Sequence, residues 1–164
     1  MQKIFDKILF LKDKYQSNIV FDTRLLKQND IFIGIGDGPK NGGLYYKEAL
    51  KKGSRLLIIN NKTINHEYII HTKNIQSFIK KFCKYLLSKY KGKVIAITGS
   101  VGKTTIKENI YNILSKNNFS VSRSYKNYNN LLGLQFSIMN INLQNKYSIF
   151  ELGINHPGEM KDLI

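Results

Sequence analysis

The stretch VIAITGSVGKTT, residues 94–105, decides how this chain folds. It joins an apolar run at residues 94–97 to two glycines and then to Lys-Thr-Thr. An apolar run, a glycine-rich turn and a helical pattern in succession indicate a strand, a tight loop and a helix. Gly99 and Gly102 allow the backbone to turn sharply and to direct N–H groups toward an anion at the positive end of that helix. The stretch therefore predicts a loop that binds the phosphates of ATP or GTP.

The side chains at the end of this loop supply the rest of a phosphate site. Lys103 is long enough to reach the β- and γ-phosphates, and the Thr104 hydroxyl is a ligand for Mg²⁺. The match to G-x-x-x-x-G-K-[ST] is incomplete because Ile97 occupies the first glycine position. The shorter pattern T-G-S-x-G-K-T-T is nevertheless specific after a strand. We expect ATP and Mg²⁺ as cofactors, with the nucleotide held by Gly99, Ser100, Val101, Gly102, Lys103, Thr104 and Thr105.

The chain is strongly basic, with 26 Lys and Arg residues against 11 Asp and Glu residues and a net charge of +15. Residues 1–90 hold 17 of the basic and 7 of the acidic residues, and residues 91–164 hold the other 9 and 4. A nucleic-acid site gathers Lys and Arg into one stripe or patch, whereas here the excess extends along the whole chain. We interpret it as a solvated surface and expect no nucleic-acid partner.

Several features indicate the cytoplasm. No apolar run approaches the ~20 residues of a transmembrane helix, and charges interrupt residues 1–7 too often for a secretory signal. Cys83 is the only cysteine, so no internal disulfide can form. It lies on the apolar side of a helical pattern, which predicts a packed thiol and not a nucleophile. We expect a cytoplasmic protein that does not insert into membranes.

The first 90 residues alternate between short apolar runs and helical patterns. Strands are expected at residues 19–21, 30–35, 56–59 and 68–70, and helices around residues 4–9 and over residues 45–52 and 75–90. A glycine-rich loop covers residues 36–43. Lys91-Gly92-Lys93 follows the last of these helices, and we place a domain boundary near residue 91.

The same alternation continues after the phosphate loop. The expected elements are a helix that ends near residues 117–118, with Ile106, Ile110, Ile113 and Leu114 as its core face, a strand at 119–121, a helix at 134–141 and a strand at 147–150. Such alternation implies a doubly wound parallel sheet with ligands at the carboxyl ends of its strands. The fold class is therefore α/β: a small mixed α/β domain, residues 1–90, precedes a parallel-sheet P-loop domain, residues 91–164, that we expect to be truncated.

Glu151 stands at the carboxyl end of the last expected strand. A carboxylate beside a phosphate loop is well placed to hold the Mg²⁺ of a nucleotide, directly or through water. Two asparagine-containing segments, at residues 126–130 and 155–159, leave two interpretations open. They either donate hydrogen bonds to a substrate or form a surface loop and a turn.

Three segments together resemble the Mur ligases of bacterial cell-wall synthesis. They are residues 97–105, the pattern N-x-N-N at residues 127–130, and E-L-G-x-N-H-x-G-E at residues 151–159. Residues 21–24, 29–33 and 49–59 resemble the N-terminal domain that holds the uridine end of the substrate in this family. The resemblance is strongest to the members that add D-alanyl-D-alanine to a UDP-N-acetylmuramoyl tripeptide.

The resemblance implies an ATP- and Mg²⁺-dependent ligase, expected to be a monomer. In that reaction the carboxylate of the UDP-N-acetylmuramoyl tripeptide attacks the γ-phosphorus of ATP, and the amine of D-alanyl-D-alanine captures the acyl phosphate. The implied roles are catalysis by Lys103 and Glu151, Mg²⁺ ligation by Thr104 and Glu151, and substrate contacts by Thr23, Arg24, Asn130 and His156.

In the family, further catalytic residues and a C-terminal domain follow the part that this chain resembles. We therefore expect residues 1–164 alone to bind phosphate weakly and to carry out no ligase turnover. Two other interpretations stay open. An amide ligase of the folylpolyglutamate or cyanophycin type is disfavoured by the uridine-site-like N-terminal half. A non-catalytic nucleotide-binding module would be favoured by an encoded stop after Ile164.

Overall fold

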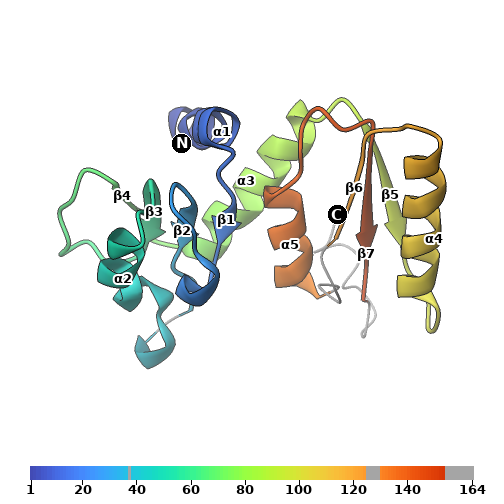
Figure 1. Ribbon diagram of the computed structural model, residues 1–164. Coiled ribbons are helices and arrows are strands. Elements are labelled where there is room, and N and C mark those ends of the chain that lie inside the picture. Colours follow the sequence, from blue (N-terminus) through green and yellow to red (C-terminus); the bar gives the residue numbers. More distant parts are fainter. Residues whose placement is uncertain (37, 125–129, 154–164) are drawn as a thin grey trace. The chain divides into compact units, whose positions relative to one another are not determined.

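A computed structural model describes residues 1–36, 38–124 and 130–153 (Figure 1). The chain divides into two compact units, Met1–Phe82 and Cys83–Ile164. The division falls inside helix α3 (Ile75–Lys89). The domain boundary predicted near residue 91 lies just after that helix and stays a prediction. None of the helices in the described residues has the length and apolar character needed to span a bilayer.

The first unit contains a four-stranded parallel sheet in the order β1-β2-β3-β4. Its strands are β1 (Ile19–Val20), β2 (Ile31–Ile33), β3 (Leu56–Ile59) and β4 (Ile69–His71). All four side chains of β3 are buried, as expected for a central strand of a parallel sheet that is covered on both faces. The four strands were predicted from their apolar runs, and the structure shortens the first two and moves the last by one residue.

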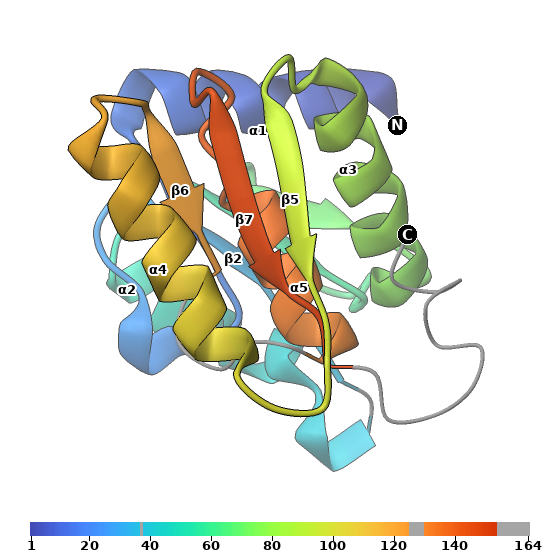
Figure 2. The same ribbon diagram turned by 90° about the vertical axis from the view of Figure 1, so that its right-hand side faces the viewer.

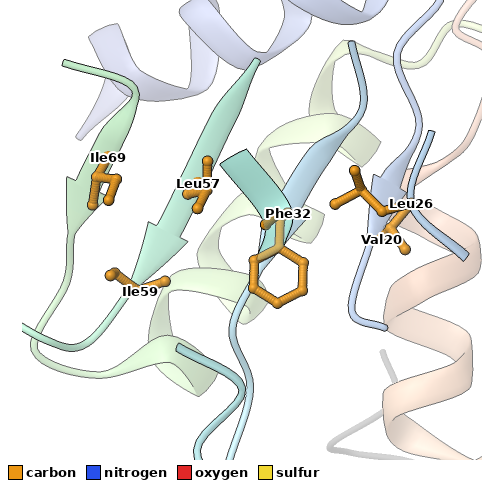
Figure 3. Close-up of a cluster of buried hydrophobic side chains, with 7 residues drawn as sticks. Val20, Leu26, Phe32, Leu57, Ile59 and Ile69 are labelled. Atoms are coloured by element: carbon orange, nitrogen blue, oxygen red, sulfur yellow. The ribbon is translucent and has the colours of Figure 1, made fainter. Parts of the chain in front are cut away.

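One face of this sheet carries a continuous apolar cluster (Figure 3). Because side chains alternate along a strand, Leu57 and Ile59 point to this face together with Phe32 of the neighbouring strand. Helix α2 (Tyr46–Lys51) adds the fully buried Ala49. The cluster consists of Val20, Leu26, Phe32, Ala49, Leu57, Ile59 and Ile69.

Helices α1 (Gln2–Tyr15) and α3 pack against each other through aromatic rings, and α3 passes behind the strands in Figure 1. The Phe5 ring lies 5.5 Å from Phe78 and 5.2 Å from Phe82, measured between ring centroids. Asn74 caps α3, because its Oδ1 accepts a hydrogen bond from the Ser77 N–H at 2.8 Å. The helix predicted over residues 75–90 is therefore confirmed.

The second unit holds a three-stranded parallel sheet in the order β5-β7-β6. The strands are β5 (Lys93–Ile97), β7 (Tyr147–Glu151) and β6 (Val121–Arg123). Figure 2 shows helix α4 (Lys103–Lys116) on one face of this sheet and α5 (Leu131–Met139) on the other. This confirms the predicted α/β architecture with helices on both faces of a parallel sheet.

In the second unit, two elements begin at residues other than those predicted. Strand β6 begins at Val121 and not at residue 119, because the turn that ends α4 continues through Asn118 (φ 59°) to Phe119, whose N–H donates to the Leu114 carbonyl. Helix α5 begins at Leu131, three residues before the predicted start, because the Asn130 side chain accepts from the Gly133 N–H and caps it there.

The predicted core face of α4 is confirmed only in part: Ile110 and Leu114 are half-buried, whereas Ile106 and Ile113 are exposed. Ile106 and Ile113 are 48% and 60% exposed, whereas Lys107 is 1% exposed. The helical pattern of apolar residues predicted that these isoleucines face the core, because such a pattern assigns every lysine to the solvent. The rotation of α4 instead brings Lys107 toward the carboxylate of Glu151 at the end of β7.

Candidate functional site

The loop between β5 and α4 has the backbone geometry predicted from its glycines. Gly102 caps the helix with φ 79° and Gly99 has φ 150°. An added Cβ at Gly102 would meet no atom within 4 Å, so glycine is required there for its backbone conformation and not for space. The loop is open, with Val101 at 90% exposure. Its N–H groups and the first turn of a 14-residue helix thus face solvent at the positive end of the helix.

Lys103 is the first residue of α4 and reaches back across this loop. Its Nζ donates a hydrogen bond to the Gly99 carbonyl at 2.7 Å. The contact places a positive charge beside the exposed loop backbone, where a phosphate would need it.

Thr104 and Glu151 come together beneath the loop. The Thr104 hydroxyl donates to Glu151 Oε2 at 2.9 Å. Strand pairing explains the approach, because Ile97, at the end of β5, lies opposite Glu151 in the register of β5 and β7. Glu151 is 2% exposed, and its backbone N–H donates to the Ser124 hydroxyl at 3.2 Å. The carboxylate is thus held through both its backbone and its side chain.

A chain of charged groups that the sequence analysis missed extends from this carboxylate. Lys107 Nζ lies 3.3 Å from Glu151 Oε2 and 3.7 Å from Glu108 Oε1. Arg123 Nε lies 3.0 Å from Glu108 Oε2, and the Arg123 guanidinium sits 3.6 Å above the Tyr111 ring. The available signal was spacing, because Lys107 follows Thr104 by three residues and so shares its face of the helix.

Oxygen ligands are what Mg²⁺ prefers, and Thr104 and Glu151 present a hydroxyl and a carboxylate at hydrogen-bond distance from each other. Among the residues that the structure describes, no three His, Cys, Asp or Glu side chains gather into a metal site. The donor set therefore fits a metal that takes a few protein ligands and completes its shell with phosphate oxygens and water.

The predicted uridine-site residues lie in the first unit, in the 3₁₀ turn η1 (Thr23–Leu25) after β1. Thr23 is buried and its carbonyl accepts from Lys52 Nζ at 2.7 Å. The exposed Arg24 donates two hydrogen bonds to the Asp22 carboxylate, from Nε to Oδ1 at 2.9 Å and from Nη2 to Oδ2 at 2.6 Å. These hydrogen bonds lower the pKa of Asp22. Asp22 therefore stays ionised and orients the guanidinium.

A glycine-rich loop follows β2 in the same unit. Gly34, directly after β2, lies so close to the end of this loop that an added Cβ would be 2.5 Å from the Gly43 backbone N. Asn41 fastens the loop, since its Oδ1 accepts from the Gly43 N–H and its Nδ2 donates to Asn60 Oδ1 at 2.7 Å.

The other predicted substrate residues are placed only in part. Asn130 is exposed and serves as the cap of α5. Asn127, Asn129 and His156 lie outside the described residues, so their roles stay predictions.

Residues 97–164 match the family model described as the Mur ligase middle domain. The chain is similar to Mur ligases over about nine-tenths of its length. The Rickettsia prowazekii UDP-N-acetylmuramoyl-tripeptide–D-alanyl-D-alanine ligase is 37% identical over 150 residues, which are 90% of this chain and 33% of that protein. The chain thus spans about a third of the length of the curated relatives it matches.

Two solved Mur ligase structures share this fold. A MurF ligase from Thermotoga maritima, in complex with ADP, matches 90% of this chain and 34% of its own, with a TM-score of 0.73 and 30% identity. A UDP-N-acetylmuramoylalanyl-D-glutamyl-2,6-diaminopimelate–D-alanyl-D-alanyl ligase from Acinetobacter baumannii matches 93% of this chain and 37% of its own, with a TM-score of 0.76 and 24% identity. The second similarity concerns the fold alone.

Proposed function

We propose that this chain carries the ATP-phosphate site and the uridine-substrate site of a ligase that joins D-alanyl-D-alanine to a UDP-N-acetylmuramoyl tripeptide. The observation that carries the proposal is the hydrogen bond of Thr104 to Glu151 under a glycine loop that Lys103 spans. The relative with 37% identity is named for this activity. The Thermotoga maritima enzyme, which has the same fold, was solved in complex with ADP, and this supports nucleotide binding by the chain. The chain alone is expected to carry out no turnover.

In the proposed reaction, a substrate carboxylate attacks the γ-phosphorus of ATP, and an amine then displaces phosphate from the acyl phosphate. The site must hold anions together and stabilise the charge on the transferred phosphoryl group. Loop N–H groups would bind the phosphates, and the Lys103 ammonium would neutralise charge on the β- and γ-phosphates. Thr104 and Glu151 would hold Mg²⁺, which when bound supplies further charge neutralisation.

The uridine nucleotide is proposed to bind at the first unit through Thr23 and Arg24. Arg24 turns Nε and Nη2 toward Asp22. A guanidinium has five N–H donors, so those not used by Asp22 can bind a diphosphate. A cytoplasmic location and a monomeric state are further proposals.

Calorimetric titration of the chain with ATP in Mg²⁺ tests the nucleotide site. Lys103→Ala should weaken binding about 10- to 100-fold, since hydrogen bonds to charged groups contribute about 1.5–3 kcal/mol. Lys116→Ala is the matched control, because Lys116 is exposed at the other end of α4 and carries the same charge. Equal affinities of the two variants would refute the proposed site.

A further inference from the structure

Lys107 is buried where an apolar residue would be expected. It is 1% exposed on a helix whose neighbouring Ile106 is 48% exposed. Lysine is almost never fully buried unless it is paired. Replacing a buried ion pair with packed apolar residues is often neutral or stabilising, so the presence of such a pair is weak evidence for a role in stability. The inverted pattern therefore points to a role in the site that Lys107 faces.

The Lys107 ammonium shares one oxygen with the Thr104 hydroxyl. Glu151 Oε2 lies 2.9 Å from Thr104 Oγ1 and 3.3 Å from Lys107 Nζ. Residues three apart on a helix lie on one face, so α4 directs both groups at the same carboxylate. Two donors that converge on one oxygen define the orientation of the carboxylate more tightly than either alone.

A second carboxylate also lies close to the ammonium. Glu108 Oε1 lies 3.7 Å from Lys107 Nζ, while Glu108 Oε2 lies 3.0 Å from Arg123 Nε. The Arg123 guanidinium in turn lies on the Tyr111 ring at 3.6 Å. The position of Lys107 is thus set by groups on both α4 and β6.

We propose that Lys107 is a positioning residue for the metal site. Its ammonium holds the Glu151 carboxylate in the orientation that accepts the Thr104 hydrogen bond, so that both oxygen ligands are aimed before the nucleotide arrives. Lys107 acts through Glu151 and does not touch the nucleotide. The inference rests on the proposed function, because it assumes that Thr104 and Glu151 hold the Mg²⁺ of ATP.

The test is the ratio of ATP affinities measured by calorimetry in Mg²⁺ and in EDTA. Lys107→Met should lower this ratio about 10-fold or more, as loss of a residue that orients a metal ligand usually does. The affinity in EDTA should change little. Lys107→Arg keeps the cation and should restore part of the ratio, and Lys116→Met is the control for loss of one charge from α4.

A double-mutant cycle separates positioning from a general effect on folding. In the Glu151→Gln background, Lys107→Met should change the ratio no further, because the carboxylate that it positions is gone. An undiminished effect in that background would overturn the inference. If Lys107→Met does not fold, two other comparisons of the Mg²⁺-to-EDTA affinity ratio replace it. Glu151→Gln is compared with the double variant, which has lost both buried charges, and Lys107→Arg is compared with the wild type.

The outcomes distinguish this inference from the proposed function. If the wild-type chain binds ATP without any dependence on Mg²⁺, the proposed metal site fails, and the role of Lys107 fails with it. If the wild-type ratio is large and Lys107→Met leaves it unchanged, only the role of Lys107 is refuted.

Discussion

Thr104 and Glu151 are 47 residues apart in the chain, yet the hydroxyl of one donates to the carboxylate of the other at 2.9 Å. The two residues end up together because α4 begins after β5, and β7 pairs with β5 so that Glu151 lies opposite Ile97. Parallel pairing brings the carboxyl ends of strands to one edge of a sheet, where the loops that bind ligands also lie. The glycine loop and a carboxylate distant in sequence are thus brought together at one edge of the sheet.

Removing the Thr104 hydroxyl should weaken nucleotide binding only when Mg²⁺ is present. Thr104→Val keeps the shape of the side chain but removes the proposed metal ligand, and we expect an affinity loss of about 10-fold or more in Mg²⁺. Thr104→Ser retains the hydroxyl and serves as the matched control. Titration with ATP in Mg²⁺ and in EDTA checks the prediction, and an equal loss in both conditions would contradict it.

Gly102→Ala should destabilise the chain through backbone conformation alone. With φ 79° and no atom within 4 Å of an added Cβ, the cost is the left-handed strain of about 1–2 kcal/mol. Gly38→Ala is the control, because Gly38 has φ 55° and equally open surroundings. Urea unfolding should show similar costs for both, whereas only Gly102→Ala should weaken ATP binding. Loss of binding in both variants would oppose a specific role for the loop.

Gly34→Ala should cost more than either of these. Its Cβ would lie 2.5 Å from the Gly43 backbone N, and backbone atoms cannot rotate away as a side chain can. The measurement is again urea unfolding. A cost no greater than that of Gly38→Ala would show that the loop after β2 adjusts freely.

Arg24→Ala should weaken binding of a UDP-linked sugar more than Lys27→Ala does. Both residues are exposed and lie close together in the chain, so each substitution removes one positive charge from the same surface. Only Arg24 has a guanidinium oriented by Asp22. Calorimetric titration with UDP-N-acetylmuramic acid should show a loss of about 10-fold for Arg24→Ala. Equal losses of affinity in Arg24→Ala and Lys27→Ala would contradict the prediction, because they would be explained by the loss of one positive charge.

Cys83 should be unreactive in the folded chain. Burial raises the pKa of its thiol from 9.0 to about 12, and the thiolate is the reactive form. Labelling with a thiol-specific disulfide reagent at pH 8 should be slow until urea unfolds the chain. The folded chain binds this proton more tightly than the unfolded chain, so the stabilisation is complete below pH 9.0 and is lost as the pH rises toward 12.

Local patterns were sufficient to predict much of this molecule. Leu56–Ile59 is a strand with the predicted bounds, and the glycine loop takes positive φ at both Gly99 and Gly102. Both the strand and the loop are determined by residues adjacent in sequence, the strand by its apolar run and the loop by glycines that the turn requires. The glycine loop and the carboxylate at the end of β7 could therefore be singled out before their contact was known.

Long-range contacts account for what the sequence analysis missed. Lys107 is buried because it meets a carboxylate 44 residues further along, and no periodicity rule contains that partner. On the same helix Ile113 is exposed, contrary to the amphipathic pattern. The shifted start of α5 reflects a cap, Asn130, in a stretch where asparagine is too frequent to mark a helix start.

The most direct test of the account is a crystal structure of this chain with Mg²⁺ and a non-hydrolysable ATP analogue. We predict that the phosphates lie against the N–H groups of the loop at Gly99–Gly102, with the Lys103 ammonium beside them and Mg²⁺ between the phosphates, Thr104 and Glu151. An analogue bound elsewhere, with Lys103 still on the Gly99 carbonyl, would contradict the account.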